Sequence, residues 1–108
     1  MEKDAATILE DAADLLLIHG RSQCTGRARS GKFCVLGAIA EAQQPGWWTD
    51  GFPWYWRVVR TDPAAVAAVA ALGFPDDGAV AEWNDETADD FEVIDRLRLS
   101  AKTLRNQS

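Results

Sequence analysis

The chain is 108 residues long, 47% hydrophobic and 26% charged, with a formal net charge of -6 at pH 7. This length and composition are typical of one globular domain and not of a disordered protein. No apolar run approaches the roughly 20 residues that cross a bilayer, and residues 1–4 lack the basic start of a signal peptide, so we expect a cytoplasmic protein without a membrane segment. The negative charge argues against nonspecific binding of nucleic acid, which depends on clustered cations.

Charges are distributed unevenly along the chain. Residues 61–93 contain nine acidic residues and no Lys or Arg: Asp62, Asp76, Asp77, Glu82, Asp85, Glu86, Asp89, Asp90 and Glu92. Basic residues gather instead in residues 20–33 and near the C-terminus: Arg21, Arg27, Arg29, Lys32, Arg96, Arg98, Lys102 and Arg105. We therefore expect separate acidic and basic faces, and a solvated face with charges at helix starts is the simplest interpretation of the acidic run.

Residues 4–19 begin the predicted elements with an amphipathic helix. Apolar residues recur there at three- and four-residue spacing, Asp4 is a candidate N-cap, and Gly20 is the expected end. Residues 21–32, rich in Arg, Ser and Gly, indicate a loop. A short buried helix is then predicted over residues 33–40, where small residues would let another helix approach closely: Gly37, Ala38 and Ala40.

Residues 43–60 are predicted to form a long, irregular, Trp-rich loop. Two prolines and two glycines interrupt this segment, which also carries six aromatic residues: Trp47, Trp48, Phe52, Trp54, Tyr55 and Trp56. The pattern leaves residues 54–59 open between a short strand and a helical turn.

Three further helices are predicted in the second half. Asp62 followed by Pro63 indicates the start of a helix over residues 64–72, which Gly73 would end. A short helix is expected over residues 79–83. Thr87 with Asp90 resembles a capping box that opens a last helix, and this helix is expected to bury Phe91, Ile94, Leu97, Ala101 and Leu104.

The predicted fold is therefore mostly α, a compact single domain over residues 1–108. It consists of four or five short helices with the long Trp-rich loop, and residues 106–108 are expected to form a frayed tail.

One segment resembles a nucleotide-binding motif. Residues 26–32 run from Gly26 to Gly31-Lys32 with the spacing of a phosphate-binding loop, but Phe33 stands where that motif needs Ser or Thr to hold magnesium. No strand is predicted to precede the loop, so we interpret it as a basic surface loop.

No catalytic, metal or cofactor site is predicted. His19, Cys24 and Cys34 would supply three zinc ligands, but the paired Cys-x-x-Cys spacing is absent and no fourth ligand stands out. Acidic pairs such as Asp76-Asp77 stand at predicted helix starts, where the helix dipole explains them.

The aromatic residues of the Trp-rich loop are candidates for binding a protein partner. Trp and Tyr are favoured at interface hot spots, and so many large side chains are difficult for a small domain to bury. For at least half of them, however, filling the core is the favoured interpretation. The candidate partner-binding residues are Trp47, Trp48, Trp54 and Trp56.

Two short motifs carry a family resemblance. The residues Cys34, Gly37 and Ala38, followed later by Trp83-Asn84-Asp85, resemble an uncharacterised family of short proteins from actinobacteria and their phages. The Trp-rich segment departs from that family. The resemblance implies no catalytic residues, and the motif residues are expected to be structural: Trp83 would end the short helix in the core, and Asn84 or Asp85 would accept backbone hydrogen bonds at the turn into the last helix.

The leading functional hypothesis is a non-enzymatic protein-interaction module, such as a phage or mobile-element factor that binds a host protein in the host cytoplasm; a homodimer is one form of association. The alternative is a small enzyme or ligand-binding domain with a pocket formed by His19, Cys24 and the Trp-rich loop. A DNA-binding regulator is disfavoured, because Glu82 and the Asp76-Asp77 pair carry the wrong charge for a major groove.

Overall fold

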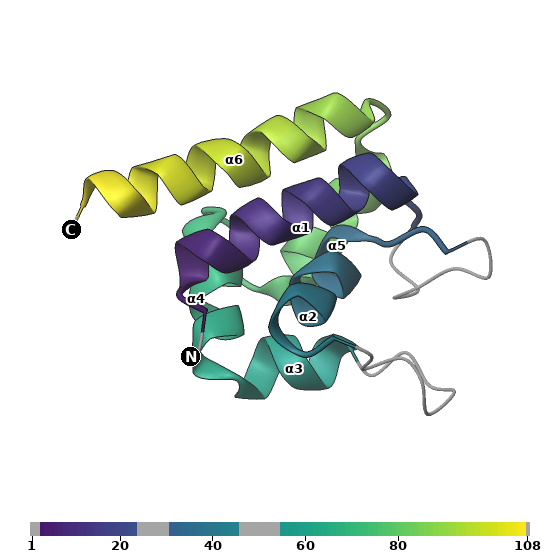
Figure 1. Cartoon of the computed structure of the whole chain (residues 1–108). Coiled ribbons are helices and arrows are strands. Elements are labelled where there is room, and N and C mark those ends of the chain that lie inside the picture. Colours follow the sequence, from purple (N-terminus) through teal and green to yellow (C-terminus); the bar gives the residue numbers. More distant parts are fainter. Residues whose placement is uncertain (1–2, 24–30, 46–54, 108) are drawn as a thin grey trace.

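The computed structural model describes residues 3–23, 31–45 and 55–107. This part of the chain forms one mostly α-helical domain, as predicted, but with six helices instead of four or five. They are α1 (Ala5–His19), α2 (Val35–Gln43), α3 (Tyr55–Thr61), α4 (Pro63–Ala71), α5 (Asp77–Glu86) and α6 (Asp90–Asn106) (Figure 1). None of these helices is long and apolar enough to cross a membrane.

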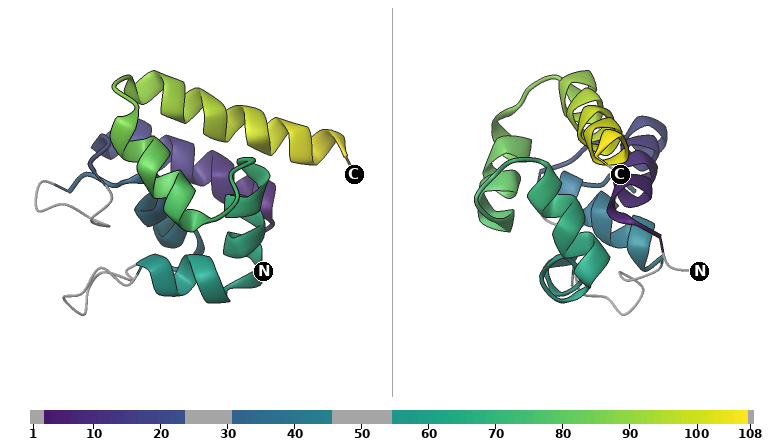
Figure 2. Two further views of the ribbon diagram at one scale, coloured as in Figure 1. Left: turned by 180° about the vertical axis from the view of Figure 1, so that it is seen from behind. Right: turned by 90° about the vertical axis from the view of Figure 1, so that its left-hand side faces the viewer.

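Helix α2 lies at the centre of the domain. It packs against α1 on one side and contacts α3, α4 and α5 on its others (Figure 2). Helix α6 lies along α1, so that α1 has α6 on one side and α2 on another (Figures 1 and 2). The largest fully buried apolar side chains come from α1, α2 and α6 and from the residues just before α2 and just after α4: Phe33, Ile8, Leu9, Leu16, Leu36, Ile39, Leu72 and Leu97.

The predicted ends of α1 and the start of α4 are confirmed. The Asp4 carboxylate accepts a hydrogen bond from the Thr7 N–H at 2.8 Å, and α1 ends at Gly20 with a φ of 88°, a left-handed value that favours glycine. Asp62 caps α4 by accepting from the N–H groups of Ala64 and Ala65, both at 3.1 Å. These caps satisfy amide donors that have no partner within their own helix.

The Asp62 carboxylate also joins α4 to the end of α2. Burial alone would raise the pKa of Asp62, but hydrogen bonds from the Gln43 side chain and from the two capped amides outweigh it and hold the pKa below its usual value. The ionised carboxylate is therefore the form that the folded protein stabilises.

Asp62→Ala should lower the free energy of unfolding near neutral pH by about 1 to 2 kcal/mol, the usual cost of losing an N-cap. Because the folded-state pKa is depressed, the ionised form's contribution is present above the unfolded pKa of about 3.9 and is lost as the pH falls through the folded value. Urea unfolding at several pH values measures the difference in the free energy of unfolding between wild type and variant. Asp62→Asn, which keeps an oxygen acceptor, should retain most of the stability. If the difference between wild type and Asp62→Ala stayed constant into strong acid, the stabilising role of the ionised carboxylate would be contradicted.

The expected irregular segment over residues 43–60 is shorter at both ends. Helix α2 continues through Gln43, and Tyr55–Thr61 forms α3, which decides the open choice between strand and helical turn in favour of a helix. The prolines and glycines that interrupt the segment all lie before residue 54. Val58 and Val59 bury their side chains where α3 packs on α2 and α4. The remaining residues of the expected loop, 46–54, lie outside the described residues.

Two expectations about the last helix are wrong. Its N-cap is Asp89, which accepts from the Phe91 N–H at 2.9 Å, whereas Thr87 is the C-cap of α5 and its hydroxyl donates to the Trp83 carbonyl. Phe91 is 64% exposed, because the side of the helix that faces α1 is formed by other residues: Val93, Ile94, Leu97, Ser100 and Ala101. The helix also continues through Asn106, the first residue of the expected tail, and α5 is longer than expected at both ends.

Candidate functional site

The two motifs behind the family resemblance meet in space. Asn84 is fully buried in α5, and its side-chain oxygen accepts a hydrogen bond from the Val35 N–H at 3.0 Å. Its amide nitrogen donates to the Ser22 carbonyl and to the Asp85 carboxylate, both at 2.9 Å. The Asn84 oxygen thus satisfies the first amide of α2 and not a group at the turn into α6, which corrects the role expected for Asn84.

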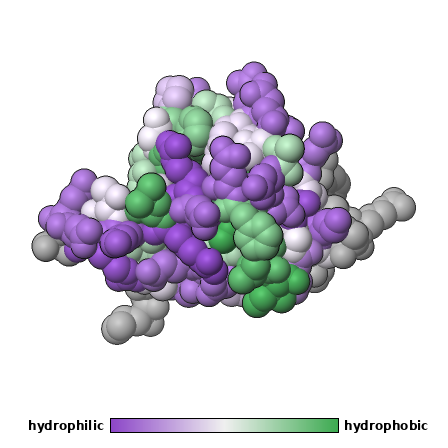
Figure 3. Space-filling model, turned by 90° about the horizontal axis from the view of Figure 1, so that it is seen from above, coloured by the Kyte–Doolittle hydropathy of each residue, from purple (hydrophilic) through white to green (hydrophobic). Residues whose placement is uncertain are grey.

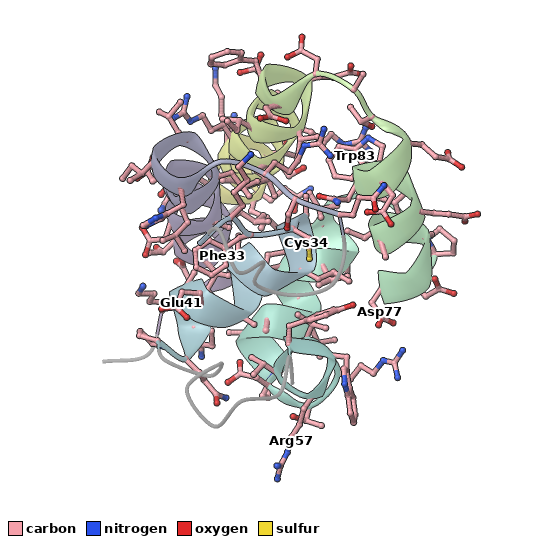
Figure 4. All side chains as sticks on the ribbon, turned by 90° about the vertical axis from the view of Figure 1, so that its right-hand side faces the viewer. Phe33, Cys34, Glu41, Arg57, Asp77 and Trp83 are labelled. Atoms are coloured by element: carbon pink, nitrogen blue, oxygen red, sulfur yellow. The ribbon has the colours of Figure 1, made fainter. Side chains whose placement is uncertain are left out.

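Cys34 caps the same end of α2. Its Sγ accepts from the Gly37 N–H at 3.2 Å, and its side chain is completely buried, as are Gly37 and Ala38. The view of all side chains shows Cys34 at the start of α2, within the body of the domain (Figure 4). Since a fully buried thiol that caps a helix has no access to a substrate, its place fits a role in packing.

Arg21 adds further contacts to this junction between α2 and α5. Its guanidinium side chain is only 9% exposed and donates to the carbonyls of Asn84 and Thr87, at the C-terminal end of α5. The same side chain pairs with Asp90 at 3.0 Å, at the start of α6. Sequence reasoning missed this residue because it was placed in a basic surface loop, and nothing in its local sequence distinguishes it from its arginine neighbours. Its contacts connect the ends of three helices.

Trp83 lies at the edge of the core and not in its interior. It is partly buried on α5 (Figure 4). Its ring centre is 5.1 Å from that of Phe74, and the Arg96 guanidinium lies over both rings. Arg96 also donates to the Leu72 carbonyl at 2.5 Å. The expectation that Trp83 ends the helix inside the core is therefore wrong. Its ring instead stacks on Phe74 at the edge of the core.

The residues weighed for zinc and nucleotide binding do not form a described site. His19 is exposed with its ring edge against Phe33, whereas Cys34 is buried; Cys24 and most of the arginine loop fall outside the described residues. Phe33 is a core residue with 2% of its surface exposed. In the part of the chain that the structure describes, no group of three His, Cys, Asp or Glu residues is placed to hold a metal ion.

A groove runs across α3, α4 and α5, and we call it the α3–α5 groove. It consists of two adjoining hollows with volumes of about 250 and 340 Å³. Both are lined by Arg60 and Asp77, whose side chains form an ion pair at 2.9 Å and so divide one hollow from the other. Figure 4 shows Asp77 at the start of α5, on the side towards α3, whereas Arg57 points away from the protein.

Apolar and aromatic side chains form most of this groove. The first hollow is lined by Val59, Val66, Val69 and Phe74, and the second by Leu36, Tyr55, Trp56 and Ala81. Trp56 is 41% exposed, and the Arg60 guanidinium lies over its ring at 5.9 Å from the ring centre.

Of the four predicted partner-binding tryptophans, the structure describes Trp56, whereas Trp47, Trp48 and Trp54 lie outside the described residues. Sequence reasoning missed the contribution of α4. A signal was present, since α4 has no charged residue and is apolar on all sides, which is typical of a helix that is buried or contacts a partner.

Comparison with known proteins gives one match. The model of a family described as "Family of unknown function (DUF6197)" matches residues 1–103, which include both motifs of the junction. No curated protein matches the chain, and no solved structure matches it.

Proposed function

This chain belongs to the DUF6197 family of unknown function, and we propose that it is a non-enzymatic module that binds another protein through the α3–α5 groove. The observation that carries this proposal is the exposed Trp56 beside two apolar hollows. The resemblance to short actinobacterial and phage proteins extends the proposal to a phage or mobile-element factor that acts on a host protein in the cytoplasm.

The residues of the groove have the chemistry of a binding hot spot. Trp, Tyr and Arg are enriched among the residues that dominate the free energy of protein association, and Trp56, Tyr55 and Arg60 lie together here. Each hollow is at or below the lower end of the range for small-molecule pockets, about 300 to 1,000 Å³. Shallow paired hollows of this size suit two apolar anchor side chains of a peptide segment better than one enclosed metabolite.

The acidic residues around the groove indicate which residues flank the apolar anchors in the partner's segment. Asp76 and Asp77 line the groove, and α5 continues with the exposed acidic residues Glu82, Asp85 and Glu86. The lining cation Arg60 is already paired with Asp77. We therefore propose that the partner presents an amphipathic segment in which apolar anchors are flanked by Lys or Arg, and that its affinity falls as salt is raised.

Trp56→Ala tests the groove directly. Selection of a displayed random-peptide library on the immobilised protein should enrich peptides with aromatic or aliphatic anchors and basic flanks. Their affinity should fall at least about tenfold on Trp56→Ala, because an exposed indole at the centre of the contact is lost. The free energy of unfolding of the variant should change by less than about 1 kcal/mol, since the side chain is largely outside the core.

Arg57→Ala is the matched control, because Arg57 is the next residue of α3 and its side chain points away from the domain (Figure 4). It should leave peptide affinity unchanged. Peptides that bind wild type and Trp56→Ala equally well would refute the proposal, and so would a selection that enriches no common pattern.

For the alternative, a pocket formed by His19, Cys24 and the Trp-rich loop, the structure describes His19 and the ends of that loop, whereas Cys24 and residues 46–54 lie outside the described residues. His19 is exposed at the end of α1 and lines neither of the two hollows.

A further inference from the structure

The outer side of α6 carries a second exposed apolar surface, far in sequence from the groove. Phe91 is 64% exposed and Leu99 is 61% exposed, although they belong to a helix whose opposite side is buried against α1. Phe91, Asp95, Leu99 and Lys102 follow one another at four-, four- and three-residue spacing, so they form one stripe along the outside of the helix.

Apolar residues of α1 extend this surface. Ile18 is 74% exposed and Leu17 is half exposed. The ion pairs Arg21–Asp90 and Arg98–Asp14 connect α1 to α6 on either side of these two residues, which places them beside the first half of α6. Figure 3, which looks down on the protein from above, shows a hydrophobic patch towards one edge of this face and a smaller one apart from it, with hydrophilic residues between them.

The charges of α6 change sign along the helix. The acidic residues Asp90, Glu92 and Asp95 come first, and the basic residues Arg96, Arg98, Lys102 and Arg105 follow them. Several of these already have partners: Asp90 pairs with Arg21, Arg98 with Asp14, and Arg105 with Glu10. Asp95 and Lys102, by contrast, are exposed and form no ion pair within the described residues.

We propose that two copies of this chain associate through the outer stripes of their α6 helices, arranged antiparallel about a two-fold axis beside Leu99. In this register Asp95 of each copy faces Lys102 of the other, because the axis lies midway between these two residues. The Leu99 side chains then pack together near the axis, and Glu92 of each copy comes beside the other copy's Arg105.

A second copy fits this surface better than a different protein does. A partner with a single sign of charge would match either Asp95 or Lys102 but not both, whereas an antiparallel copy of the same helix places an Asp95 against a Lys102 on each side of the axis. A two-fold interface is self-complementary in this way, since the same patch is used by both subunits. A helix of this length is about 25 Å long, so the contact area is small and the dimer should be weak and dependent on concentration.

Sedimentation velocity over a concentration range that extends to the millimolar is the first measurement. Wild type should show a reversible monomer–dimer equilibrium that added salt weakens. Lys102→Asp should weaken association at least about tenfold, because the two-fold axis turns one substitution into two contacts between like charges. Asp95→Lys should have the same effect, whereas the double variant Asp95→Lys with Lys102→Asp should restore association to within about threefold of wild type.

Trp56→Ala serves as the control and should leave dimerisation unchanged, because Trp56 lies in the α3–α5 groove. This control also distinguishes dimerisation through α6 from partner binding through the α3–α5 groove, because each of the two proposals can be wrong while the other is right. Circular dichroism shows whether each charge variant keeps its helical content. A protein that stays monomeric at every concentration would overturn the proposal, as would a dimer that survives both single substitutions, or one that Trp56→Ala dissociates.

Discussion

Phe33→Thr should lower the free energy of unfolding by about 3 to 5 kcal/mol and confer no affinity for ATP. This substitution completes the phosphate-loop pattern that Gly26, Gly31 and Lys32 begin. The structure places Phe33 in the core: among the described residues it is the largest of the fully buried side chains, and its backbone pairs with Gly20 and Ser22. A hydroxyl in place of the ring would leave a cavity in the core and would not reach a nucleotide.

Urea unfolding and calorimetric titration with ATP check the two halves of this prediction. Phe33→Leu is the control, because it keeps an apolar side chain at the site and should cost less than half as much as Phe33→Thr. A Phe33→Thr protein as stable as wild type would contradict the core assignment. Micromolar affinity for ATP that Lys32→Ala abolishes would show that the loop is a nucleotide site after all.

Asn84→Ala should lower the free energy of unfolding by about 3 kcal/mol. The substitution leaves the Val35 N–H and the Ser22 carbonyl without the side-chain partner that each has now, and an unsatisfied buried polar group costs about 1 to 3 kcal/mol. The small cavity left by the amide adds to this cost.

Glu82→Ala, on the same helix but exposed, is the matched control and should change the free energy of unfolding by less than about 0.5 kcal/mol. Amide hydrogen exchange gives a second and more specific readout. The Val35 amide should exchange faster in Asn84→Ala because its acceptor is gone, and should be unaffected by Glu82→Ala. Equal stability of the two variants would mean that the junction between α2 and α5 contributes little.

The sequence alone determined those features that depend on neighbours within a few residues. Asp4 and Gly20 delimit α1, and Asp62 with Pro63 begins α4, because caps act on amides and carbonyls of the adjoining turn. The mostly α character follows from apolar spacing in the same way. Both motifs of the Asn84 junction were visible in the sequence as well, but their contact was not.

The tertiary structure alone decided everything that joins distant residues. Asn84 and Val35 are 49 positions apart, and Arg21 reaches Asn84, Thr87 and Asp90 from the other end of the chain, so no local pattern reveals these bonds.

The structure also decided which apolar residues face outward. Tyr55–Thr61 is a helix because Val58 and Val59 pack against its neighbours, and Phe91 is exposed because α1 covers a different side of α6. Periodicity shows that a helix has an apolar side, but which residues are buried depends on where the neighbouring helices lie. The α3–α5 groove exists for the same reason: three short helices, α3, α4 and α5, enclose it because each of them packs against α2.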